Sequence, residues 1–152
     1  REIDNIRGTL YRQTMFAEFE KQIHGKVVKD EPITLELIKN IYHSLLEKYF
    51  HNSLILDSEL DYECLRIPHF YSSFYVYKYA TGISCAYYLF DKISKGDEVA
   101  LKNYMNFLKS GGSKYSIDLL KNAGVDITVS TPIQNTLNKF SFLVDSLDEL
   151  TK

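Results

Sequence analysis

Hydrophobic residues recur every three or four positions through most of the chain, which is the spacing of an amphipathic helix. Residues 3–25 form the first predicted helix, with Gly25 as its C-terminal stop. The second predicted helix begins after Pro32, takes Thr34 as its N-cap and ends near Phe50. The apolar faces comprise Ile6, Leu10, Met15, Phe16, Phe19 and Ile23 in the first helix and Leu37, Ile41, Leu45 and Tyr49 in the second.

The middle of the chain begins with a mixed signal and continues with a strong one. Residues 51–68 fit either a short strand or a turn of helix, so we expect an irregular segment that Pro68 closes. A third predicted helix carries residues 69–82 and continues to a stop at Gly96.

Three more helices are predicted towards the end of the chain. Asp97 caps a fourth helix that runs to about Ser110. Ser116 caps a fifth helix that ends at Gly124, and Thr131 caps the last one. The predicted inward residues are Val99, Tyr104, Phe107 and Leu108 in the fourth helix and Ile133, Leu137, Phe140, Val144 and Leu147 in the last. No alternating strand pattern longer than a few residues occurs, so we predict an all-α fold, a multi-helix orthogonal bundle.

Length and charge limit the classes of function. The 152 residues, 45% of them hydrophobic, can build one core, so we expect residues 1–152 to be a single domain. Lys and Arg total 18 against 20 Asp and Glu, without a run of like charges, which disfavours nucleic acids and anionic membranes as partners. The helical pattern is already running just after Arg1, which predicts a piece of a longer polypeptide. Two cysteines are too few for a disulfide framework and favour the cytoplasm.

The segment IPHFYSSFYVYKYATG, residues 67–82, combines one histidine with six aromatic residues. On a helix, Tyr71, Tyr75 and Tyr79 would form one row, and other aromatic residues the neighbouring row. A phenol stays protonated at neutral pH, so a tyrosine that faces a dry cleft can donate to a negative oxygen, as can His69. The alternative is structural: His69 would cap the helix, and the tyrosines would bridge layers of the core.

Other polar groups are weaker candidates. No H-E-x-x-H zinc helix is present. We expect Glu18, Glu20 and His24 to form a solvated helix side rather than a metal cluster. The remaining expectations concern a solvated acidic face (Asp57, Glu59, Asp61, Glu63), single histidines without a companion (His43, His51) and a packing cysteine (Cys85).

Four blocks of sequence, in residues 7–24, 66–82, 104–126 and 131–140, resemble the C-terminal part of oligoendopeptidase F. That family comprises zinc metallopeptidases related to thimet oligopeptidase. The resemblance implies that two histidines of an H-E-x-x-H helix and a glutamate hold zinc upstream of the part represented here.

The same resemblance implies roles for residues of the aromatic segment. His69 would bind the substrate backbone, Tyr77 would be the oxyanion donor with Tyr75 as the second choice, and Tyr71 would contact substrate. The expected function is therefore the substrate-binding half of a zinc peptidase cleft, completed by the upstream part of the same polypeptide and acting on short peptides. We expect no metal ligand in this chain and no activity from it alone. A different function remains open, namely a non-catalytic helical module that binds a peptide or helix in an aromatic groove.

Overall fold

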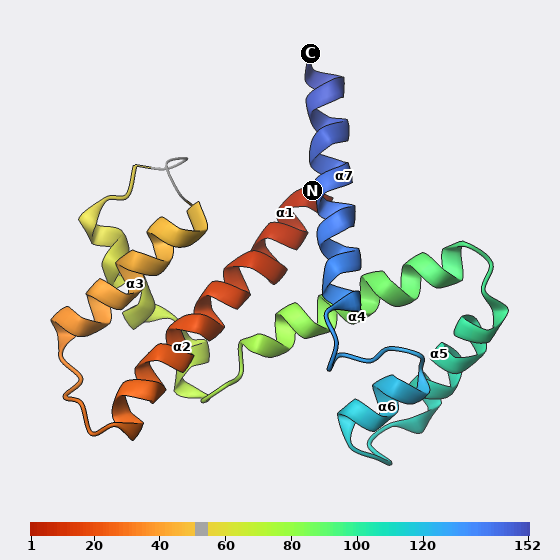
Figure 1. Ribbon diagram of the computed structural model, residues 1–152, viewed down its shortest axis with the longest axis horizontal. Helices are drawn as coiled ribbons and strands as arrows, with labels where there is room; N and C mark the ends of the chain where they lie inside the picture. The colour runs from red at the N-terminus through yellow and green to blue at the C-terminus, as the bar shows by residue number, and fades with distance from the viewer. Residues whose placement is uncertain (51–54) are drawn as a thin grey trace. The chain divides into compact units, whose positions relative to one another are not determined.

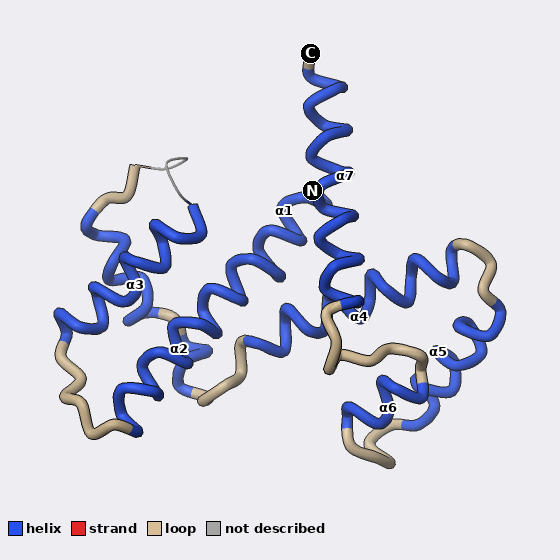
Figure 2. Tube along the Cα trace, in the orientation of Figure 1, coloured by secondary structure: helices blue, strands red, loops and turns tan. Residues whose placement is uncertain are grey.

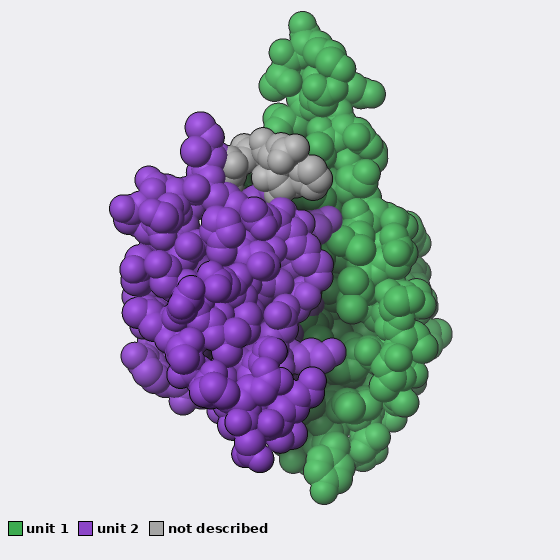
Figure 3. Space-filling model, turned by 60° about the vertical axis from the view of Figure 1, so that its left-hand side comes forward, with its two compact units in different colours: residues 1–10, 81–152 green, residues 11–80 purple. Residues whose placement is uncertain are grey.

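The computed structural model describes residues 1–50 and 55–152, and in these ranges the regular structure is entirely helical. The all-α prediction is therefore confirmed for the described residues (Figures 1 and 2). The predictions for His51 and for the start of the irregular segment fall on residues 51–54, outside these ranges. The chain divides into two compact units, residues 11–80 and residues 1–10 with 81–152, coloured separately in Figure 3.

The unit of residues 11–80 is built on two packed helices, α2 (Arg12–Val28) and α3 (Leu35–Phe50). Two 3₁₀ helices follow, η3 (Ser58–Arg66) and η4 (Pro68–Tyr71). The buried core residues are Met15, Phe16, Phe19, Tyr42, Leu45, Leu46, Cys64 and Val76. The helix spacing seen in the sequence thus places one apolar face of α2 against one of α3.

The ends of α2 and α3 give one correction and one confirmation. Gly25 is not the stop of α2, because the helix continues to Val28. Asp30 ends it instead: at φ +55° it takes the left-handed position, and the N–H of Glu31 bonds the carbonyl of Lys26 at 3.1 Å. Thr34 caps α3 as predicted, since its Oγ1 accepts the N–H of Leu37 at 3.2 Å.

Of the four acidic residues expected to be solvated, Asp57 and Glu59 are exposed, but the prediction is wrong for Asp61 and Glu63. Glu63 accepts hydrogen bonds from Arg12 at 2.5 Å and from the Tyr42 hydroxyl at 2.6 Å, and its side chain is only 12% exposed. Asp61 lies 2.8 Å from Nδ1 of His43. His43 therefore does have a companion, contrary to our expectation, and both contacts pin η3 to α2 and α3.

The second unit contains α1 (Glu2–Ile6), most of the π-helical turn η1 (Arg7–Tyr11), most of α4 (Tyr77–Ser94), α5 (Glu98–Ser110), α6 (Ser116–Asn122) and α7 (Thr131–Thr151). Helix α1 packs on α7 and α5 on α6. A small core cluster of this second unit is formed by Cys85, Leu89 and Val125. Cys85 therefore has the packing role expected for it.

The helix ends predicted in this unit from the local sequence are only partly correct. The Asp97 cap is confirmed by a 2.9 Å bond from the N–H of Ala100, and Gly124 at φ +88° follows the end of α6. Ser116 and Thr131 are not caps, because each is already the first residue of its helix.

The predicted inward faces of α5 and α7 are wrong at several positions. Val99 is 68% exposed and Leu108 55%, whereas Tyr104 and Phe107 are half-buried. On α7, half-buried Leu137 and Phe140 contrast with exposed Ile133, Val144 and Leu147. The periodic pattern did identify an apolar face on each helix, but the described residues pack against only part of that face, and the rest is exposed. Within those residues no helix combines the length and apolarity needed to cross a membrane.

Candidate functional site

The aromatic segment is anchored in the core at two points and turns sharply between them. Phe70 packs its ring against those of Phe16 and Phe19, with centroids 5.6 and 5.2 Å apart. Val76 is fully buried. These two side chains hold the segment against α2, and the residues between them have to form a loop that turns back on itself.

That loop is a β-turn, not the helix we predicted. The carbonyl of Ser72 accepts the N–H of Tyr75 at 3.1 Å, and Phe74, the third residue of the turn, has φ +57°. A left-handed conformation costs a residue with a Cβ roughly 1–2 kcal/mol. Helix α4 begins only at Tyr77, so the predicted helical row through Tyr71 and Tyr75 does not exist.

Two residues of α2 support this turn. The carboxylate of Glu20, which is 5% exposed, accepts the N–H of Phe74 at 2.7 Å. The ring of His24 lies against that of Phe74, with centroids 4.5 Å apart. We expected Glu20 to belong to a solvated helix side, and this expectation is wrong because Glu20 is buried. Its partner is a backbone N–H more than fifty positions along the chain.

Beyond the turn, His69, Tyr75 and Tyr79 form a compact group that we call the aromatic cluster. The rings of His69 and Tyr75 are stacked, with an interplanar angle of 3° and centroids 5.5 Å apart. The ring of Tyr79 meets both edge-on, at 5.7 Å from His69 and 5.5 Å from Tyr75. Three polar aromatic side chains are thereby brought together from η4, the turn and the first turns of α4.

Hydrogen bonds link the cluster in a defined direction. The Tyr79 hydroxyl donates to the Tyr75 oxygen at 3.3 Å and lies 3.3 Å from Nε2 of His69. In the tautomer with its proton on Nε2, His69 donates to the Tyr79 hydroxyl. The bond to Tyr75 raises the pKa of Tyr79, which keeps this phenol neutral. The chain of bonds ends at Tyr75, which is 37% exposed and keeps its own O–H for an outside acceptor.

The other two predicted site residues lie outside this cluster of ring contacts. Tyr71 ends η4 and is 86% exposed. Tyr77 opens α4 and is 47% exposed. Because positions two apart on a helix point to different sides, Tyr77 does not share the orientation of Tyr79. Sequence reasoning grouped Tyr79 with Tyr75 but missed it as a partner of His69, because helical spacing does not reveal the turn at Phe74 that brings these residues together.

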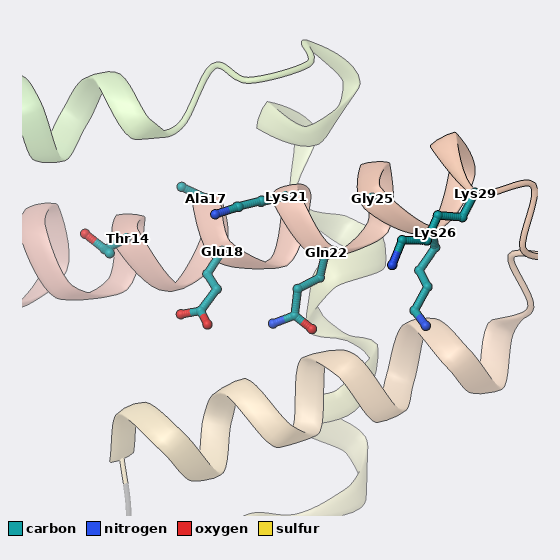
Figure 4. A pocket seen from close by; sticks show the side chains of 8 residues that line it. All are labelled: Thr14, Ala17, Glu18, Lys21, Gln22, Gly25, Lys26 and Lys29. Atoms are coloured by element: carbon teal, nitrogen blue, oxygen red, sulfur yellow. The ribbon is translucent and has the colours of Figure 1, made fainter.

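A groove of about 590 Å³ runs along a different face of α2 (Figure 4). Its lining residues are Thr14, Ala17, Glu18, Lys21, Gln22, Gly25, Lys26 and Lys29. Two of the charged groups are already paired, Glu18 with Lys48 at 2.6 Å and Lys26 with Glu31 at 2.7 Å. No member of the aromatic cluster lines this groove, so it is separate from the candidate site.

Comparison with known proteins shows which family the chain resembles in sequence. Residues 1–139 match the sequence model of peptidase family M3. The chain belongs to peptidase family M3. Similar proteins include oligopeptidase PepF of Bacillus subtilis, 47% identical over 97% of this chain and 22% of the relative. An oligoendopeptidase F homolog of Borreliella burgdorferi is 47% identical over 98% of this chain and 25% of its own length.

A solved structure is similar over the same span. The crystal structure of oligoendopeptidase-F from Enterococcus faecium matches this family M3 chain with a TM-score of 0.96 and 39% identity. The match covers 99% of this chain and 29% of that one. The chain thus spans about a quarter of the length of the curated relatives it matches.

The metal-binding capacity of this family M3 chain is limited. In residues 1–50 and 55–152, no three His, Cys, Asp or Glu side chains converge as a metal site would require. His69 faces two tyrosines, and the carboxylate of Glu20 is directed at a backbone N–H. The described residues therefore do not fit a zinc ion. What the candidate site offers is hydrogen-bond donors.

Proposed function

We propose that this chain forms the substrate-binding and oxyanion-stabilising half of the cleft of an oligoendopeptidase F-like zinc peptidase that hydrolyses short peptides. The zinc ligands would lie in other parts of the same polypeptide. The main support is the set of hydrogen bonds that links His69 through Tyr79 to Tyr75, which is 37% exposed. The relatives' names, oligopeptidase and oligoendopeptidase, support the substrate class.

Within this proposal, neutral phenols act on the negative charge that develops on the substrate carbonyl oxygen. We assign this role to Tyr77, which the family resemblance favours, and to Tyr75, at which the hydrogen-bond chain ends. Preorganised donors of this kind act mainly in the transition state, because the carbonyl oxygen gains charge only there. His69 binds the substrate backbone, and the highly exposed Tyr71 makes a further substrate contact.

The test is kinetic and uses the complete polypeptide that contains these residues. Tyr75→Phe and Tyr77→Phe keep the ring and remove only the hydroxyl. With an internally quenched peptide as substrate, loss of the oxyanion donor should lower kcat by roughly a hundredfold to a thousandfold, with a much smaller change in KM. Tyr87→Phe is the matched control, because that hydroxyl bonds Glu2 and lies outside the cluster. Wild-type turnover in both the Tyr75→Phe and the Tyr77→Phe protein would contradict the proposal.

Two further parts of the proposal have their own tests. The chain alone should not cleave the quenched peptide with zinc added, because its described residues supply no converging ligands. Peptide binding without hydrolysis in the complete polypeptide would favour the non-catalytic module instead. We also propose a cytoplasmic location, which two free, buried thiols support. Fractionation of cells that express the complete polypeptide would test it.

A further inference from the structure

We infer that Glu20 is a positioning residue for the proposed site: its carboxylate holds the Phe74 backbone in the conformation that delivers Tyr75 to His69 and Tyr79. The catalytic consequence rests on the proposed function, whereas the structural consequence can be measured independently. Glu20 itself lies in α2 and touches the turn, not the aromatic cluster.

The turn needs such a support because its sequence does not favour it. In a β-turn closed by Ser72 and Tyr75, a positive φ at the third residue is normally supplied by glycine or asparagine. Here the third residue is Phe74, whose Cβ disfavours φ +57°. The surroundings must therefore impose this conformation, and the contact to Glu20 is made by the Phe74 backbone itself.

Glu20 is well suited to impose it. A carboxylate with 5% exposure requires hydrogen-bond donors, and the Phe74 N–H at 2.7 Å is such a donor. One helical turn further along the same face of α2, the ring of His24 contacts the Phe74 ring at a tilt of 33°. One face of α2 thus fixes both the backbone and the side chain of Phe74.

The geometry of the aromatic cluster depends on the backbone conformation of Phe74. Phe70 and Val76 are held in the core, so the turn between them alone decides the direction of Tyr75. If Phe74 relaxed to a negative φ, the peptide that leads into Tyr75 would rotate. The stacking of Tyr75 on His69 and its bond to Tyr79 would then be lost, while the core anchors stayed in place.

The variants separate this role from a general effect on stability. Glu20→Met removes the acceptor at similar volume, and Glu20→Gln keeps an oxygen that can accept the Phe74 N–H. Glu18→Met is the matched control, because Glu18 lies on the same helix but bonds Lys48 and Tyr49. Phe74→Pro tests the other partner at an exposed position, since proline lacks the N–H and cannot adopt a positive φ.

The measurements are kcat and KM of the complete polypeptide with the quenched peptide, and a crystal structure of the Glu20→Met protein. We expect Glu20→Met and Phe74→Pro to lower kcat about tenfold to a hundredfold, since a displacement of about 1 Å has that effect. KM should change less than about threefold, and Glu20→Gln and Glu18→Met should retain kcat within about threefold. The crystal structure should show Phe74 at negative φ and Tyr75 turned away from His69.

Each outcome bears on the inference. An unchanged turn in the Glu20→Met crystal structure, or an equal loss of kcat in the Glu18→Met protein, overturns it. Should Glu20→Met not fold, full turnover in the Phe74→Pro protein overturns it as well. If the turn is released but Tyr75→Phe and Tyr77→Phe both keep wild-type turnover, the proposed function fails and the structural role of Glu20 stands.

Discussion

Replacing Glu63 by methionine should be among the most damaging single changes to the unit of residues 11–80. Glu63 connects three elements, because its carboxylate accepts from Arg12 on α2 and from Tyr42 on α3 while it belongs to η3. Burial and the bond to Glu63 raise the pKa of Tyr42, so this hydroxyl stays protonated and needs an acceptor. Methionine has a similar volume but accepts neither bond.

The magnitude follows from the exposure of the partners. Tyr42 is fully buried, so its hydroxyl cannot turn to water, and leaving it without an acceptor costs about 1–3 kcal/mol. The Arg12 side chain is 37% exposed and regains hydration, so losing that ion pair adds only about 1 kcal/mol or less. Glu63→Met should therefore lower the free energy of unfolding by about 1–4 kcal/mol, against about 1 kcal/mol for Tyr42→Phe.

Urea unfolding followed by circular dichroism would measure these changes, and the double variant makes the reasoning testable. In a Tyr42→Phe background no hydroxyl is stranded, so Glu63→Met should cost about 1–2 kcal/mol less than it does in the wild type. Additive effects of the two substitutions would refute the argument from the buried hydroxyl. So would a Glu63→Met protein within about 0.5 kcal/mol of the wild type.

Three other predictions concern local features. The bond to Asp61 raises the pKa of His43, so charged His43 stabilises the fold fully below about pH 6.5, and this stabilisation is lost as the pH rises through the raised pKa. The urea midpoints of the wild type and His43→Gln should therefore converge as the pH rises through that range. A difference between the midpoints that stays constant with pH would contradict this. Burial raises the pKa of Cys64 to about 11 and also raises the pKa of Cys85. Iodoacetamide at about pH 8 should therefore label neither thiol until urea unfolds the chain. Rapid labelling of the folded protein would be inconsistent with buried thiols. Asp97→Ala should lower the free energy of unfolding by about 1 kcal/mol and Asp97→Ser by much less, whereas equal losses would argue against the cap.

Features that depend on neighbours in sequence could be predicted. The Thr34 and Asp97 caps bond to N–H groups three residues away, so the residue type and its position before an apolar run were sufficient. The helix α3 was predicted for the same reason, with its end at Phe50. The resemblance to oligoendopeptidase F also led to the correct family.

Features that depend on distant contacts could not be predicted. The spacing of Tyr71, Tyr75 and Tyr79 is helical, yet the segment turns at Phe74 because of a bond to Glu20 in another helix. Periodicity counts positions along the chain and contains no information on such a partner. The burial of Glu63 has the same origin, since an acidic run is solvated only if no Arg or Tyr comes from elsewhere to bind it.

The central claim, that phenol hydroxyls of this chain donate to a developing oxyanion, is tested most directly with a tetrahedral analogue of the reaction. The measurement is the inhibition constant of a phosphinic peptide against the complete polypeptide, for the wild type, Tyr75→Phe and Tyr77→Phe. We expect the inhibition constant to rise by about the factor by which kcat/KM falls, because the analogue and the transition state engage the same donors. An unchanged inhibition constant in both variants would contradict the claim.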